Sequence, residues 1–330
     1  MAEMPWPGAV AVSGGADSLA LMHLLARWAR AGKRAKPLVL SVDHGLRPQS
    51  GKDAKSVARR AKALGLACEI LTVAGKKPKS DIEAWARDQR YRLMGDRLKR
   101  HGLAALYVGH HQNDQAETFL LRLARGSGLD GLGAMRRLNA FPLPGFEALA
   151  LARPLLTVPR AQLRDFLTRW KQDWLEDPMN GEARFARNRI RALMPSLEAA
   201  GLTAERIADA ALHLARAREA LDMATAAVLA RVARRQDQIF LLDPDALAAA
   251  PREIGLRALA ALLGTVSGAA YRPRFDGLER LLDRVAASAL GGGATLHGCR
   301  ISPAPRRLQA FGPKTLVIAC ENSRRRAGRA

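Results

Sequence analysis

A run of six residues, Ser13-Gly14-Gly15-Ala16-Asp17-Ser18, has the residue types that bind phosphate. Two glycines let the backbone approach a phosphate closely, and a helix beginning after them offers unpaired N–H groups and the positive end of its dipole. The hydroxyls of Ser13 and Ser18 add donors. Asp17 would repel phosphate unless a divalent cation lies between them, so the run also predicts Mg²⁺. A plain Ser/Gly turn is the structural alternative, and the missing lysine excludes a Walker A loop.

A second segment, His110-His111-Gln112-Asn113-Asp114-Gln115-Ala116-Glu117-Thr118, combines two carboxylates with histidine. Asp114 and Glu117 are three residues apart, so on a helix they share a face, with His110 one turn earlier at its mouth. Such a group suits a metal-bound phosphate or proton removal from an attacking amine. The alternative is a helix start in which the dipole favours acidic residues.

Alternating strands and helices must position these two segments, in the pattern of a parallel α/β sheet. We expect strands at residues 8–12, 38–42, 67–73 and 104–108. Ser80 and Glu83 have the spacing of a capping box, which predicts a helix from there to about Arg100. The phosphate-binding run follows the first strand and the acidic segment the fourth, at the edge where open α/β sheets bind ligands. The Gly- and Pro-rich stretch 126–145 predicts a long functional loop.

The rest of the chain is predicted to be mainly helical. Helical patterns near 158–171, 184–194 and 203–232 precede short helices and possible strands at 238–242 and 314–320. A break from Pro195 to Gly201 places a domain boundary near residue 200. Trp170 and Trp174 are four residues apart, and we expect them to pack in a core rather than to stack on bases.

Composition indicates a soluble globular protein with a polyanionic partner. Of 330 residues, 48% are hydrophobic, and Lys plus Arg exceed Asp plus Glu by 53 to 31, a net charge of +22. This excess favours nucleic acid over an anionic membrane. The chain has no secretory signal and no apolar run long enough to span a bilayer. The three cysteines, Cys68, Cys299 and Cys320, lack CxxC spacing and suggest no zinc or iron–sulfur site. We expect a reduced, cytoplasmic protein with no membrane contact and no evident protein partner.

Several segments together resemble a known family. The run SGGADS resembles the SGGxDS pyrophosphate loop of the ATP pyrophosphatase superfamily, which splits ATP between its α and β phosphates. Other segments, spread in order over about residues 8–195, resemble the tRNA(Ile)-lysidine synthetase family: Val42 to Arg47, Glu83-Ala84 to Arg90-Tyr91, GHHQNDQAET, Leu121 to Gly128, Gly131-Leu132, Arg153 to Leu156, Glu176 to Pro178, and Arg187-Asn188 to Arg191. The resemblance fades beyond residue 195.

That resemblance implies a two-step reaction. ATP adenylates the wobble cytidine of an isoleucine tRNA with a CAU anticodon, and free lysine then displaces AMP to form lysidine. The implied fold is an adenine-nucleotide α-hydrolase-like (PP-loop) domain over residues 1–200, followed by a smaller, mostly helical tRNA-binding domain with a basic tail over residues 201–330.

The resemblance also implies roles for single residues. Residues 13–18 would hold the phosphates and Asp17 the Mg²⁺. His110, Asp114 and Glu117 would line the adenylation and lysine site. A second group of residues on one helix would contact a phosphate or the tRNA: Arg187, Asn188 and Arg191. The two arginines offer forked hydrogen-bond donors for this role.

The chain departs from the family at Asn113, where two successive aspartates are usual. Asp114 keeps the i, i+3 relation to Glu117, so we expect Asp114 to matter and Asn113 to cap its own helix through the amide oxygen. Two alternative functions remain. A tRNA thiolase of the same superfamily would need paired cysteines, which are lacking here. A non-catalytic RNA-binding protein on this scaffold would have no need to retain Asp17, Asp114 and Glu117.

Overall fold

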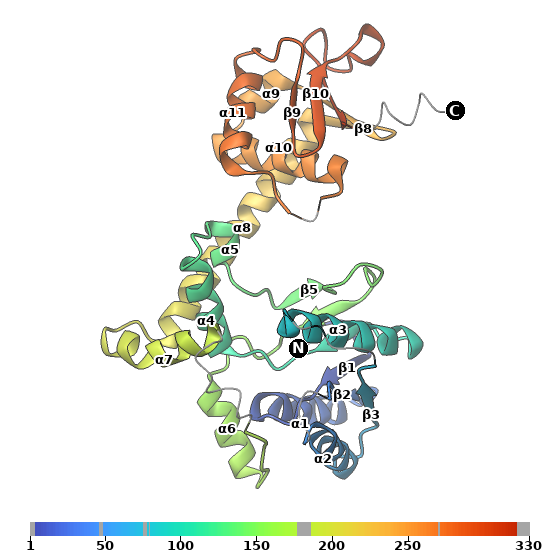
Figure 1. The fold of residues 1–330 in the computed structure, drawn as a ribbon, viewed down its shortest axis with the longest axis vertical. Coiled ribbons are helices and arrows are strands. Elements are labelled where there is room, and N and C mark those ends of the chain that lie inside the picture. Colours follow the sequence, from blue (N-terminus) through green and yellow to red (C-terminus); the bar gives the residue numbers. More distant parts are fainter. Residues whose placement is uncertain are drawn as a thin grey trace. The chain divides into compact units, whose positions relative to one another are not determined.

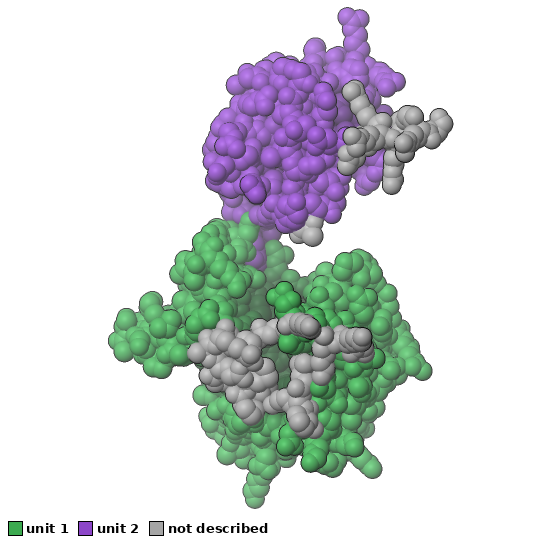
Figure 2. All heavy atoms as spheres, viewed as in Figure 1, with its two compact units in different colours: residues 1–216 green, residues 217–330 purple. Residues whose placement is uncertain are grey.

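The computed structural model describes residues 4–45, 49–74, 78, 80–176, 186–269 and 271–321. The chain divides into two compact units, residues 1–216 and 217–330 (Figure 2). The division falls within the long helix α8, Ala204–Val232. Pro195 lies inside helix α7, Ala186–Ala199, so the break in the sequence pattern marks a turn between two helices.

The first unit is built on a six-stranded sheet in the order β3-β2-β1-β4-β6-β5 (Figure 1). Its strands are β1 Gly8–Ala11, β2 Leu38–Asp43, β3 Cys68–Thr72, β4 Ala105–Tyr107, β5 Leu138–Ala140 and β6 Ala150–Ala152. All neighbouring strands are parallel except β5, which is antiparallel to β6. The predicted parallel sheet is therefore confirmed. Strands β5 and β6 were not predicted: β5 lies in the Gly- and Pro-rich stretch 126–145, and the three residues of β6 include no β-branched or aromatic side chain.

Alternate residues of the central strands supply two cores on opposite faces of the sheet. One face carries Val10, Val39, Tyr107 and Ala152, and the other carries Ala9, Leu40, Leu106 and Leu151. Helices α1 Ala16–Ala31, α2 Ser50–Ala63 and α6 Arg160–Arg169 pack on the first core, and α3 Ile82–Arg100 packs on the second (Figure 1). Both faces are thus covered by helices, as a parallel sheet requires.

The remaining elements of the first unit are α4 Gln112–Leu123 and α5 Leu129–Leu132. Stretch 126–145 contains α5 and β5, so the prediction that it lacks packed structure is wrong. Side chains of α4 hold this stretch: Arg122 donates to the carbonyl of Gly131 at 2.6 Å, and the Gln115 amide pairs with the backbone of Met135. Helix α3 begins after Asp81, so Ser80 is not its N-cap.

The second unit contains the end of α8 and an antiparallel five-stranded sheet in the order β7-β8-β11-β10-β9. Its strands are β7 Ala233–Gln236, β8 Ile239–Leu242, β9 Ala294–Leu296, β10 Cys299–Pro303 and β11 Leu316–Cys320. Its further helices are α9 Pro244–Ala248, α10 Arg252–Ser267, α11 Phe275–Ala286 and the 3₁₀-helix η2 Arg306–Leu308. The predicted strands correspond to β8 and β11. Within the described ranges, no helix has both the length and the apolar character needed to cross a membrane.

Strand β1 lies where the order of the sheet reverses, with β2 on one side and β4 on the other. In open α/β sheets the crevice at such a point, beyond the carboxyl ends of the strands, binds ligands. Gly109, just after β4, lets the end of this strand approach the start of α1: a Cβ there would lie 2.9 Å from the backbone oxygen of Asp17. The fold therefore brings the two predicted segments together.

Candidate active site

The phosphate-binding run forms a closed turn between β1 and α1. The Ser18 hydroxyl donates to the Gly15 carbonyl at 3.0 Å and accepts the Ser13 N–H at 3.2 Å. Gly14 has φ 92°, a left-handed conformation that suits glycine. Gly15 precedes α1 and provides no side-chain cap, so the first N–H groups of the helix lack intrahelical partners and can bind an anion. In this structure the Ser18 hydroxyl closes the turn itself.

Asp17, in the first turn of α1, faces side chains from two distant segments. Its Oδ2 lies 3.4 Å from Nε2 of His111, and its Oδ1 lies 3.8 Å from Nε of Arg160. Within the described part of the chain, that Oδ1 and that Nε are both buried without a hydrogen-bond partner. Burial raises the pKa of the Asp17 carboxyl, but the interaction with His111 and the charges of nearby arginines outweigh it and lower this pKa.

An ionised carboxylate with an unsatisfied oxygen fits a divalent cation. Mg²⁺ is commonly held by one or two carboxylates together with substrate phosphates, so it does not need a cage of protein ligands. Among the described residues, no group of three or more His, Cys, Asp or Glu side chains forms such a cage. Asp17, beside the open end of α1, fits the phosphate-dependent kind of Mg²⁺ site.

His111 connects the phosphate-binding turn with α4. Its Nδ1 accepts the backbone N–H of Asn113 at 3.2 Å, so the ring proton lies on Nε2. That Nε2 is 3.4 Å from a carboxylate oxygen of both Asp17 and Asp114. Asp114 completes a capping box by accepting the backbone N–H of His111 at 3.0 Å. The imidazole is only 2% exposed and lies between the carboxylates of Asp17 and Asp114. Because it is buried there, it holds these two carboxylates at a set separation.

Glu117 forms a forked ion pair with Arg191 of α7. Nε of Arg191 donates to Oε1 at 2.6 Å, and Nη2 donates to Oε2 at 3.1 Å. Arg191 also lies 3.9 Å from Oδ1 of Asp114. Asp114 and Glu117 are 7% and 5% exposed, so this guanidinium pairs with one buried carboxylate and lies beside another. Arg191 was expected to face a phosphate or the tRNA, but in this structure its guanidinium is hydrogen-bonded to Glu117.

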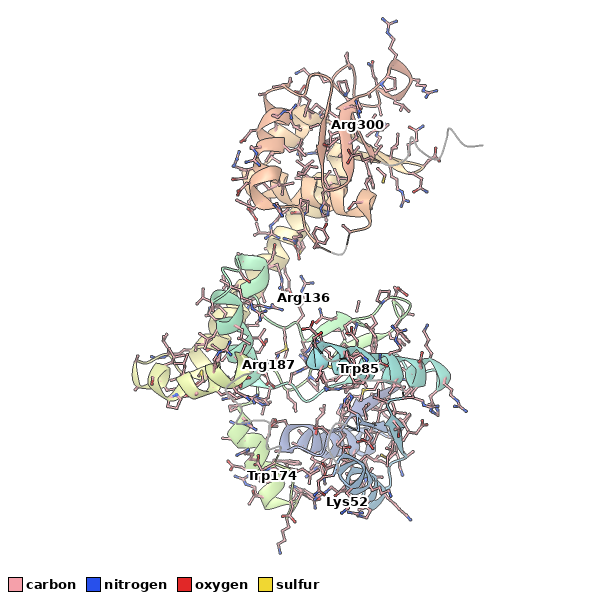
Figure 3. All side chains as sticks on the ribbon, viewed as in Figure 1. Lys52, Trp85, Arg136, Trp174, Arg187 and Arg300 are labelled. Atoms are coloured by element: carbon pink, nitrogen blue, oxygen red, sulfur yellow. The ribbon has the colours of Figure 1, made fainter. Side chains whose placement is uncertain are left out.

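Arg187 and Asn188 lie one turn before Arg191 on α7, the helix that packs against α4 (Figure 3). Arg187 is exposed and Asn188 is half-buried. The charge of Arg187 still reaches His110, whose pKa it helps to lower. The structure therefore brings Arg187 to the border of the site while leaving its side chain accessible to a large ligand.

Asn113 and Arg160 link α4 to α6. The Asn113 side-chain oxygen accepts the backbone N–H of Arg160 at 3.0 Å. Asn113 therefore caps α6, and the expectation that it caps its own helix is wrong, because His111 already caps α4. Together with Glu117, Arg191 and Met194, Asn113 and Arg160 line a pocket of about 210 Å³.

His110 forms a hydrogen bond with Arg153. Nε of Arg153 donates to Nδ1 of His110 at 3.3 Å, and the same buried guanidinium donates to Asn139 of β5 at 2.7 Å. Burial lowers the pKa of His110 to about 4, and Arg153 and Arg187 add to this effect against the opposing charge of Asp114. His110 is thus neutral at pH 7 and a weak proton acceptor.

Comparison with known proteins agrees with this geometry. Residues 7–197 match the PP-loop domain family. A tRNA(Ile)-lysidine synthase from Methylobacterium nodulans is 41% identical, and the alignment covers 90% of each chain. Another, from Bradyrhizobium diazoefficiens, is 38% identical over 97% of this chain and 91% of that one. The chain belongs to the tRNA(Ile)-lysidine synthase family. It shares with that family the ATP-binding PP-loop domain, in which residues 13–18 form the turn after β1.

A solved structure has a similar fold. A U34-tRNA thiolase from Methanococcus maripaludis matches with a TM-score of 0.51 at 16% identity, over 65% of this chain and 70% of that one. At this identity the likeness concerns the fold alone. It agrees with the parallel-sheet architecture that the alternating sequence pattern predicted.

Sequence reasoning overlooked three residues of the site: His111, Arg153 and Arg160. His111 was part of the predicted motif, but its neighbour His110 was chosen, because helical spacing gives no sign of which histidine turns toward the first strand. Arg153 and Arg160 follow β6, a strand that was not predicted. The available signal was the segment Arg153 to Leu156, which resembles the family, followed closely by Arg160.

Proposed function

We propose that this protein adenylates the wobble cytidine of an isoleucine tRNA with a CAU anticodon and then joins free lysine to it, forming lysidine. One observation carries the proposal. His111 joins a phosphate-binding turn to a buried carboxylate pair, in a chain about 40% identical to tRNA(Ile)-lysidine synthases over nearly its whole length. A cytoplasmic location is part of this proposal.

In the first step, the cytidine O2 attacks the α-phosphorus of ATP, and the bond from that phosphorus to the oxygen bridging to the β-phosphate breaks. The N–H groups at the start of α1 stabilise the charge that collects on the departing pyrophosphate. Arg160, whose Nε has no hydrogen-bond partner among the described residues, can donate to a phosphate oxygen. Mg²⁺, held by Asp17, would neutralise phosphate charge.

In the second step, the ε-amine of lysine attacks C2 of the cytidine, AMP leaves with the bridging oxygen, and the nitrogen loses a proton. Asp114 is the best placed acceptor. Both oxygens of Glu117 are engaged by Arg191, whereas Oδ1 of Asp114 lies 3.9 Å from that guanidinium, beyond hydrogen-bond distance. Nδ1 of His110 already accepts a hydrogen bond from Arg153, and burial lowers the pKa of this imidazole to about 4, well below that of an ordinary histidine.

Sulfur transfer is disfavoured by the state of two of the three cysteines, Cys68 and Cys299. Burial raises the pKa of Cys68 to about 11, and burial together with Cys320 raises that of Cys299 to about 11. Thiols with raised pKa values are poor nucleophiles at neutral pH. Cys68 begins β3, away from the ends of β1 and β4, and Cys299 belongs to the second unit.

The deciding experiment follows labelled lysine into tRNA. The purified protein is incubated with ATP, Mg²⁺, lysine and an unmodified tRNA transcript carrying the CAU anticodon. We expect one AMP and one pyrophosphate for each lysine incorporated, and no reaction with a transcript whose wobble base is uridine. ATP turnover without lysine incorporation would contradict the proposal, as would transfer of sulfur from a desulfurase.

A further inference from the structure

A second pocket lies between α1 and α6, outside the candidate active site. Its volume is about 660 Å³, within the range of small-molecule sites. It shares no lining residue with the pocket beside Glu117 and Arg191. Arg27, on its α1 side, is ten residues beyond Asp17, which places the pocket about 15 Å along the helix from the phosphate-binding turn.

The wall of this pocket offers an aromatic face. Trp170 was expected to pack in a core, yet its side chain is 50% exposed. The Phe166 ring lies 6.1 Å from it at an interplanar angle of 37°, and the guanidinium of Arg27 lies 4.4 Å above its centroid. Trp174, by contrast, packs against the first core, as expected.

The pocket is lined by both positively and negatively charged side chains. Residues Gln162, Asp165, Phe166 and Arg169 recur at helical spacing, so α6 turns one continuous face into the pocket. Arg27 and Arg169 can bind phosphate, while Asp165 and Gln162 can accept hydrogen bonds from a base amino group or a ribose hydroxyl. An inorganic anion would leave the indole unused and would meet the Asp165 carboxylate. An apolar ligand would leave three charges without partners.

We infer that this pocket binds a nucleotide, with its base stacked between Trp170 and the guanidinium of Arg27. Aromatic rings and arginine planes are the usual stacking partners of unpaired bases. Arg27 is exposed and on a flexible stem, so it can move outward to admit a base without changing either helix. The nucleotide is either a residue of the tRNA or a free mononucleotide, since both present the same base, ribose and phosphate.

The two sources can be separated with 5-fluorotryptophan in the full chain, observed by ¹⁹F NMR. The Trp170 resonance is assigned by its loss in Trp170→Phe. A shift on adding AMP alone identifies a free nucleotide site, and a shift only with unmodified tRNA transcript identifies an RNA residue. Either shift should vanish in Arg27→Ala and persist in Arg34→Ala. Arg34 is a matched control, because it also stacks on a tryptophan, Trp28 at 4.3 Å, and carries the same charge but does not line the pocket.

If the nucleotide belongs to the tRNA, Trp170→Ala should weaken tRNA binding by roughly 5- to 150-fold, the usual effect of removing one stacking partner. The KM for tRNA should rise while kcat at saturating tRNA stays unchanged. This arm rests on the proposed function, whereas the AMP arm does not.

A Trp170 resonance that responds to neither ligand, or only to protein concentration, overturns the inference. If lysine incorporation is intact in that case, the proposed function survives. If the Trp170 resonance responds but the protein cannot incorporate lysine, the nucleotide pocket is supported and the proposed function is refuted.

Discussion

Nε2 of His111 lies 3.4 Å from Oδ2 of Asp17 and equally far from Oδ2 of Asp114, so one buried imidazole spans the phosphate-binding turn and the carboxylate pair. Its Nδ1 is occupied by the backbone of α4, which leaves Nε2 no freedom to turn away. The side chain that would hold Mg²⁺ and the side chain that would accept a proton from lysine are therefore positioned by the same residue.

We expect His111→Asn to lower the rate of tRNA-dependent pyrophosphate release by roughly 10- to 100-fold, as is usual for a residue that orients a metal ligand. Asparagine can still cap α4 but cannot reach both carboxylates. The apparent affinity for Mg²⁺, titrated at saturating ATP, should fall as well. Asp17→Asn should abolish pyrophosphate release while leaving tRNA binding intact. Full activity in either variant would contradict this arrangement.

Asn113 can be tested by exchanging its amide for a carboxylate. Asn113→Asp keeps the oxygen that accepts the Arg160 N–H and adds a charge that a helix N-terminus favours, so turnover should stay within a few-fold of the wild type. Asn113→Ala should destabilise the start of α6 by about 1 kcal/mol. Asp114→Asn should disable the enzyme in steady-state lysine incorporation. Equal, severe losses in Asn113→Asp and Asp114→Asn would show that the first position is also needed.

Removing Arg191 should destabilise the first unit, because Asp114 and Glu117 would remain buried without a counter-charge. We expect Arg191→Ala to lower the free energy of unfolding by roughly 2 kcal/mol, less than for a fully buried pair because 30% of the Arg191 side chain is exposed. The double variant Arg191→Ala, Glu117→Gln should recover part of the loss. Urea unfolding followed by tryptophan fluorescence reports this unit alone, since all five tryptophans precede residue 217. A double variant no more stable than Arg191→Ala would argue against the pair.

The unfolding free energy should depend on pH through His110. The unfolded chain takes up a proton at this residue near pH 6.5, whereas the folded chain does so only near pH 4. Between these values the unfolded state binds more protons, so stability falls as the pH is lowered through this window. His110→Asn does not titrate and keeps an acceptor for Arg153, so its stability should fall less steeply between pH 7 and 4.5. Parallel curves for the two proteins would refute the assignment of a neutral, half-buried His110 in the folded state.

Affinity for tRNA should fall steeply with salt, because a chain of net charge +22 releases counterions when it contacts phosphates. With 6–10 such contacts, binding should weaken by roughly 10³- to 10⁵-fold between 50 and 200 mM salt, on the scale known for DNA. ATP affinity at constant free Mg²⁺ should vary much less. Similar slopes for both ligands, measured by filter binding and calorimetry, would mean that the excess charge does not serve RNA binding.

The sequence alone determined the local parts of this protein. Strand, glycine turn and helix follow one another in residues 8–31, and Asp114 and Glu117 share a helix face, because these relations depend only on neighbours along the chain. The charge excess and the order of the motifs likewise need no coordinates. The phosphate-binding run and the acidic segment were also predicted to meet at one edge of the sheet. This followed from the rule that open α/β sheets bind ligands at the carboxyl ends of their parallel strands.

Only the tertiary structure decided which side chains meet. The pairs His111 with Asp17, Glu117 with Arg191, and Asn113 with Arg160 join segments far apart in the chain. Their contacts depend on how α4, α6 and α7 pack around the sheet, and hydrophobic periodicity cannot give the rotation of one helix against another. The same reason separates His110 from His111: adjacent residues at a helix start differ in direction, so His111 meets Asp17 of α1 whereas His110 meets Arg153.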